Sequence, residues 1–153
     1  MNKIDLQRRP TSIDDDFALW AAEQAALLRA GRFDKLDLSN LAEELESLGR
    51  GDKYEILHRL EVLTTHLLKW EFQPEKRTNS WRSTIREQRT RIQDLLEESP
   101  SLGPHPAAVL SRAYVIGLND AITETGLPER SFPETCPYTI EQVLDVDFLP
   151  GGL

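Results

Sequence analysis

The chain has 153 residues, of which 39 % are hydrophobic and 29 % are charged, and its formal net charge is −8. This size and composition are typical of one folded domain and exclude a largely disordered or low-complexity chain. The negative charge disfavours overall binding to nucleic acid or to an anionic membrane. The single cysteine excludes an intramolecular disulfide framework and a zinc site built from several cysteines.

The N-terminal sequence MNKIDLQRRPTSIDDD is polar and has no apolar segment of signal-peptide length. No other stretch approaches the roughly 20 apolar residues that a membrane span requires. We therefore expect a cytoplasmic protein with no membrane partner. We also expect a flexible segment over residues 1–13, followed by a single helical domain over residues 14–153.

The first predicted helix follows Asp14, Asp15 and Asp16, because negative charge is favourable at a helix N-terminus. Apolar residues then recur at helical spacing as far as Leu28, and Gly31 is expected to end the helix in the left-handed conformation.

Two further helices are predicted before Pro74. A short one has a stripe of leucines and is expected to stop at Gly49. Another is expected to begin after Asp52, because Glu55 lies three residues further on, as in a capping box. The leucines of the short helix are Leu38, Leu41, Leu45 and Leu48.

Later capping and breaking residues outline the remaining helices. Ser80 is expected to cap a fourth helix that Pro100 closes, and a fifth is expected from about residue 107 to 125, ended by Gly126. Thr139 and Gln142 form a capping-box pattern that opens a short helix over residues 140–144. Since no segment shows the alternation of a half-buried strand, we predict an all-α, up-and-down bundle of four to five main helices, with the Pro-rich C-terminal segment packed across it.

Four segments together resemble a known bacterial family, the domain of unknown function 29 (DUF29). They are AEQAALLRAGRFDKLDLSNLAEELESLGR, HLLKWEFQPEKRTNSWRSTIREQR, LLEESPSLGPH and FPETCPYTIEQVLDVDFLP, and they occur in the family's order. The resemblance covers roughly residues 14–150. It implies an all-helical bundle, but it implies no activity and supplies no catalytic or binding residue.

Charge is distributed unevenly along the chain. Residues 1–57 carry 8 basic and 12 acidic side chains, residues 58–92 carry 8 and 4, and residues 93–153 carry 2 and 10. In the basic middle block, Arg82, Arg86 and Arg89 share one face of the fourth predicted helix, and Lys76 and Arg77 lie in the loop before it. Such a stripe can bind phosphate or carboxylate groups. The more ordinary interpretation is a solvated face, or one paired with acids inside the protein, such as Glu43, Glu44 and Glu46.

Our first functional hypothesis is a non-catalytic interaction protein that docks an unknown acidic protein partner through this basic face. The first alternative is a nucleic-acid binder that uses the same arginines. Nearby Trp70 and Trp81 give it only weak support, because aromatics at helical spacing are mostly core residues. A homodimer is a further alternative, since leucine-rich bundles pair through leftover apolar faces, although no stripe is visibly surplus.

The second functional alternative is a metal-dependent helical-bundle hydrolase. His58 and His66 are eight residues apart on one predicted helix, too far to share a metal ion. Glu44 and His66 are weak candidate ligands at a helix interface, but His66 is better interpreted as a structural residue with a hydrogen bond. We therefore favour no metal.

The common catalytic motifs are missing from the sequence. There is no nucleophile elbow, phosphate-binding loop or dinucleotide fingerprint, and Cys136 has no neighbouring cation in sequence to lower the pKa of its thiol. We name no catalytic residue and no cofactor. The sequence does not decide whether the protein is an enzyme, but it favours a protein that is not one.

Overall fold

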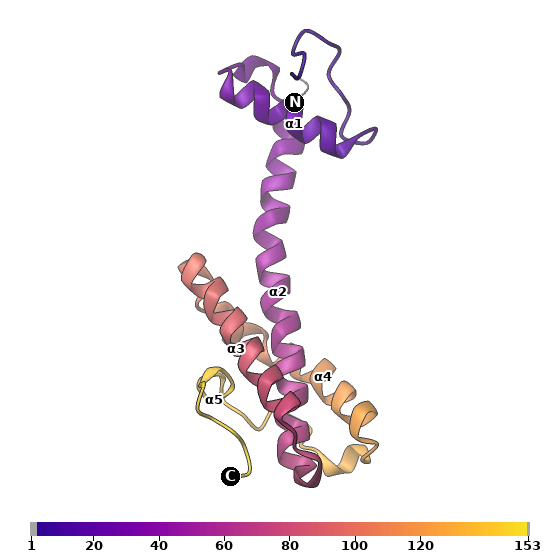
Figure 1. Ribbon diagram of the computed structural model, residues 1–153, viewed down its shortest axis with the longest axis vertical. Helices are drawn as coiled ribbons and strands as arrows, with labels where there is room; N and C mark the ends of the chain where they lie inside the picture. The colour runs from indigo at the N-terminus through magenta and orange to yellow at the C-terminus, as the bar shows by residue number, and fades with distance from the viewer. Residues whose placement is uncertain (1–2, 153) are drawn as a thin grey trace. The chain divides into compact units, whose positions relative to one another are not determined.

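The structure, a computed structural model, describes residues 3–152, which form helices with irregular segments before the first helix and after the last, and contain no strand (Figure 1). The all-α prediction is confirmed. The five α-helices are α1 (Phe17–Arg29), α2 (Leu38–Phe72), α3 (Asn79–Glu98), α4 (His105–Thr125) and α5 (Ile140–Leu144). The four one-turn 3-10 helices are η1 (Phe33–Lys35), η2 (Pro74–Lys76), η3 (Pro100–Leu102) and η4 (Glu129–Ser131). No helix in this part of the chain is both long enough and apolar enough to cross a membrane.

The chain divides into two compact units, Met1–Arg50 and Gly51–Leu153. In the first unit, the Asp16 carboxylate accepts a hydrogen bond from the Leu19 N–H and begins α1, as the run of aspartates predicted. Gly31 follows the helix with φ +70°, which confirms the predicted left-handed stop. The buried Trp20 donates its indole N–H to Asp37 and ties α1 to the chain just before α2.

Helix α2 runs without a break through Gly49 and Gly51, so the prediction of two helices separated there was wrong. Neither glycine has a positive φ, whereas the glycine stop that the sequence suggested requires the left-handed conformation. Glu46 and Arg50 form an i, i+4 ion pair at 3.8 Å across Gly49, on a surface with nothing within 4 Å of either glycine's missing side chain. Asp52 therefore lies inside a helix and caps none.

The second unit is built around one hydrophobic core. The C-terminal part of α2 contributes Leu60, Leu63 and Leu67, which are fully buried, while α3 contributes Ile85 and Ile92. Helix α4 adds a further set of buried side chains: Leu110, Ala113, Tyr114 and Ala121. These helices of the second unit thus bury one shared apolar interior, as expected of a bundle.

Capping residues set the ends of these helices. Thr78, and not Ser80 as predicted, caps α3, because its hydroxyl accepts the Trp81 N–H. Gly126 ends α4 in the left-handed conformation, as predicted. The predicted capping box of Thr139 and Gln142 and the helix over residues 140–144 are both confirmed.

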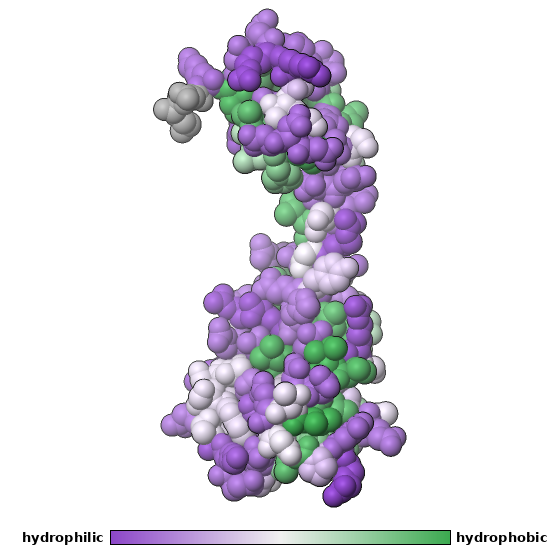
Figure 2. Space-filling view, turned by 90° about the vertical axis from the view of Figure 1, so that its right-hand side faces the viewer, coloured by the Kyte–Doolittle hydropathy of each residue, from purple (hydrophilic) through white to green (hydrophobic). Residues whose placement is uncertain are grey.

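Large apolar side chains are exposed on both units (Figure 2). Leu38, Leu45 and Leu48 of the α2 leucine stripe are 66–70 % exposed, so the expectation that no stripe would be surplus was wrong. In the second unit, Val115 and Val146 are the most exposed of the large apolar residues, at 65 % and 74 %.

An arginine-lined pocket beside helix α3

The arginines of α3 do not form one equivalent exposed row. Arg82 and Arg86 are exposed, but Arg89 is only 3 % exposed. The Arg89 guanidinium donates to the backbone oxygens of Val143 at 2.8 Å and Gln142 at 3.2 Å. Its burial lowers the pKa of Arg89, while the charge of Asp145 opposes that shift. Arg89 therefore holds the C-terminal end of α5, where a cation is favourable.

The three arginines nevertheless surround one pocket of about 170 Å³. Its other lining residues come from α3 and from the segment that follows α5: Ile85, Val146, Asp147 and Leu149. Two exposed guanidiniums thus lie beside a small cavity that also has an apolar wall and one carboxylate. We call this feature the α3 arginine pocket.

The two loop cations predicted to join the stripe lie outside the pocket lining. Arg77 donates its Nε hydrogen to the Trp70 carbonyl oxygen at 2.8 Å, and its guanidinium carbon lies 4.9 Å from the centre of the Trp70 ring. Lys76 ends η2 and is exposed. Arg82 also approaches the Trp70 ring, at 5.3 Å. These cation–π contacts hold Arg77 and Arg82 near the start of α3.

Internal salt bridges do not account for the basic face. Within residues 3–152, no ion pair shorter than 4 Å involves Lys76, Arg77, Arg82, Arg86 or Arg89. Glu46, one of the acidic residues that we considered as internal partners, forms an ion pair with Arg50 at 3.8 Å within the first unit. Arg82 and Arg86 keep guanidinium donors that an external anion can use.

The remaining cation–π contact of the second unit, at Trp81, is structural. Lys69 lies 4.5 Å from the centre of the Trp81 ring and also donates to Glu124 at 2.7 Å. Trp70 is buried, and its indole nitrogen has no hydrogen-bond partner in the described part of the chain. The buried Trp70 is therefore not an open stacking platform, and the half-buried Trp81 packs against the core with Lys69 over its ring.

The weak metal candidates are not brought together. Glu44 and His66 lie on the same helix, α2, 22 positions apart, so they cannot face each other across a helix interface as we considered. The Nδ1 hydrogen of His66 is donated to the Val62 carbonyl at 2.8 Å, which agrees with a structural role. No cluster of three or more metal-binding side chains occurs in residues 3–152.

Some polar groups of the second unit were missed by sequence reasoning. Tyr138 donates to a Glu71 carboxylate oxygen at 2.5 Å, and Tyr114 donates to the Pro133 carbonyl. Burial raises the pKa of Tyr114 to about 12, and it also raises the pKa of the Cys136 thiol, which keeps that thiol protonated. The partners are distant in sequence, and no motif links them.

The fold and the pocket define the class of protein: an all-helical chain with a small basic pocket and no metal cluster among residues 3–152. The family model described as "Domain of unknown function DUF29" matches residues 13–149, and the chain belongs to that family. No curated protein matches the chain, and no solved structure matches it either.

Proposed function

We propose that the protein is a non-catalytic interaction protein, which docks an acidic segment of a partner protein in the α3 arginine pocket. The observation that carries the proposal is that Arg82 and Arg86 line a pocket while neither forms an ion pair within residues 3–152. Guanidinium groups bind carboxylates through paired, charge-assisted hydrogen bonds, so a partner's Asp or Glu is a suitable occupant.

The rest of the pocket indicates what lies beside that carboxylate. Val146 is 74 % exposed, and Leu149 lines the same pocket. A segment with an apolar residue next to its acidic one would cover this apolar wall. Asp147 repels a second negative charge placed close to it, so the pocket favours an isolated carboxylate over a dense row of them.

Nucleic acid is the second candidate for the same arginines. The net charge of −8 opposes it, and so does the use of Arg89 and Arg77 for internal hydrogen bonds, which leaves few cations for successive phosphates. We therefore treat nucleic acid as an outcome of the experiment below.

Affinity capture from a native lysate, run with and without nuclease, tests the proposal. The variants are Arg86→Glu and the matched control Arg91→Glu, a reversal of an exposed arginine on the same helix outside the pocket. We expect a protein partner that survives nuclease, is lost with Arg86→Glu and is kept with Arg91→Glu, at unchanged melting temperatures. Equal retention by both variants contradicts the proposal, and nucleic acid removed by nuclease supports the second candidate instead.

A further inference from the structure

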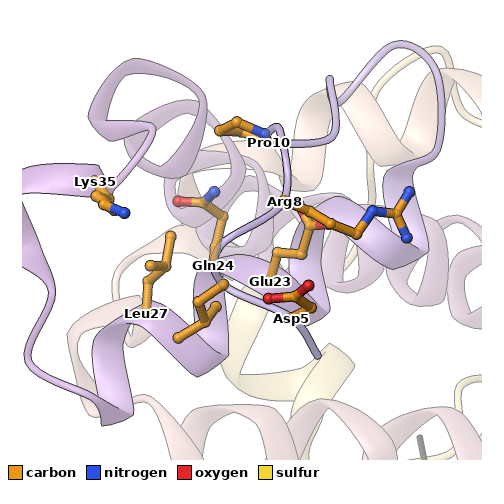
Figure 3. A pocket seen from close by; sticks show the side chains of 8 residues that line it. Asp5, Arg8, Pro10, Glu23, Gln24, Leu27 and Lys35 are labelled. Atoms are coloured by element: carbon orange, nitrogen blue, oxygen red, sulfur yellow. The ribbon is translucent and has the colours of Figure 1, made fainter. Parts of the chain in front are cut away.

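A second pocket lies entirely within the first unit, between the N-terminal segment, α1 and η1 (Figure 3). Its volume of about 290 Å³ is at the lower end of the range for small-molecule sites. Its lining has three apolar residues, Leu6, Pro10 and Leu27, one amide, Gln24, and four charged residues, Asp5, Arg8, Glu23 and Lys35. No motif in the sequence pointed to it.

Two buried polar residues fix the wall of this pocket. Glu23 is 8 % exposed, and its carboxylate accepts the Thr11 N–H at 2.9 Å and the Thr11 hydroxyl at 2.7 Å. Gln24 is 3 % exposed, and its side-chain oxygen accepts the Asp37 N–H at 2.8 Å. These bonds join the N-terminal segment and the chain before α2 to α1, so the wall is built by long-range contacts.

The pocket presents side chains of opposite charge at its two sides, Lys35 and Asp5. One oxygen of the Asp5 carboxylate accepts the Gln7 N–H at 2.9 Å, which leaves its other oxygen for a ligand. In Figure 3, Lys35 and Asp5 lie on opposite sides of the Gln24 and Leu27 side chains. Neither charge forms an ion pair within residues 3–152. The Asp37 N–H occupies the Gln24 side-chain oxygen, so the amide nitrogen is the part of this side chain that can bind a ligand.

From this arrangement we propose that the pocket binds a free apolar α-amino acid. Lys35 and the Gln24 amide nitrogen would bind the ligand carboxylate, and Asp5 would bind its ammonium group. Leu6, Leu27 and Pro10 would contact the apolar side chain. Of the four charged residues in the lining, Glu23 is bonded to Thr11, and the Arg8 guanidinium points away from Gln24 and Leu27 in Figure 3. A zwitterion would pair with the remaining two, Lys35 and Asp5, whereas a simple carboxylate would leave Asp5 without a ligand group and a simple amine would leave Lys35 without one. This site is independent of the α3 arginine pocket, which belongs to the other unit.

Isothermal titration calorimetry with L-leucine, L-methionine and L-phenylalanine as probes tests this proposal. We expect saturable binding of at least one probe to the wild-type chain. Loss of one charge-assisted contact in Lys35→Ala or Asp5→Asn should weaken it by about tenfold or more. Arg9→Ala is the matched control, because Arg9 is exposed and does not line the pocket. This variant should bind the amino acid with the affinity of the wild-type chain.

Two analogues of leucine, each with one of its charged groups missing, test whether both groups are needed for binding. 4-Methylpentanoate lacks the ammonium group of leucine, and 3-methylbutylamine lacks the carboxylate, so each should bind more weakly than leucine by about tenfold or more. Equal binding of either analogue, equal loss in Arg9→Ala, or no saturable binding of any of the three amino acids overturns the proposal. Both pocket variants change exposed charges, so their melting temperatures should match wild type and show that folding is intact.

Discussion

At the scale of single residues, equal sequence spacing conceals different roles. Arg82, Arg86 and Arg89 share a helix face, yet only Arg89 is buried and bonded to backbone oxygens. The spacing predicted the shared face correctly. It could not show that α5, more than 50 residues later in the chain, would cover one of the three guanidiniums, because that contact depends on the tertiary fold.

Replacing Arg89 should therefore cost stability, and replacing Arg86 should not. Arg89→Ala removes two hydrogen bonds from a charged donor, each worth about 1.5–3 kcal/mol, and leaves the Val143 and Gln142 oxygens without that partner. Arg86→Ala alters an exposed side chain and should stay within about 0.5 kcal/mol of wild type. Urea unfolding measures both, and a large loss in Arg86→Ala would show that this residue is also structural.

His66 should make the folded state sensitive to mild acid. Burial is the largest cause that lowers the pKa of His66 below 6.5; Lys69 lowers it further, while the Val62 carbonyl and Glu124 oppose the shift. Because the unfolded chain then binds the proton more tightly, the free energy of unfolding should fall as pH drops below about 6.5 towards the folded pKa. Above that pH the contribution is fully present.

Urea unfolding of wild type and His66→Gln across this pH range measures the effect. The variant should lose the part of the pH dependence that belongs to this histidine, and its stability should change less between pH 7 and the acidic end of the range. Parallel curves for the two proteins would rule out His66 as the source.

At the scale of helices, two kinds of glycine have to be distinguished. Gly31 and Gly126 end helices in the left-handed conformation, as the sequence suggested, while Gly49 and Gly51 lie inside α2. The same residue type is compatible with both conformations, so only the neighbours could discriminate, and the ion pair of Glu46 and Arg50 was the missed signal. Helix ends marked by proline were predicted more reliably, because proline cannot donate the hydrogen bond that an interior position needs.

Substituting alanine at Gly49 and Gly117 should have opposite effects. At Gly49 nothing lies within 4 Å of an added Cβ, so Gly49→Ala should stabilise the chain by about 0.5–1 kcal/mol. At Gly117 an added Cβ would lie 2.1 Å from the Thr64 hydroxyl and 3.0 Å from the Glu61 carbonyl of α2. Gly117→Ala should therefore destabilise by about 1–3 kcal/mol.

Thermal and urea unfolding of these two variants give the comparison directly, since the substitution is the same in each. Equal effects at both positions would contradict the close approach of α2 and α4 at Gly117. Stabilisation at Gly49 would agree with an unbroken α2, whereas a loss there would indicate that the helix is interrupted as the sequence first suggested.

At the scale of the whole molecule, the all-helical class and the family followed from periodicity, caps and four matching segments. The basic block was also evident, but the pocket on α3 was not, because Val146, Asp147 and Leu149 lie far from the arginines in sequence. The pocket of the first unit was missed for the same reason, since residues near 5, 24 and 35 meet only when the N-terminal segment bonds to α1. Long-range contacts between short polar segments leave no periodic signal.

The dissociation constant of the captured acidic partner for wild type, Arg86→Glu and Arg91→Glu, measured at low and physiological salt, is the most direct test of the central claim. We predict that Arg86→Glu weakens binding by about tenfold or more, that Arg91→Glu stays close to wild type, and that added salt weakens the wild-type complex. Equal affinities for the two reversals, or an affinity that salt does not change, would contradict docking in the α3 arginine pocket.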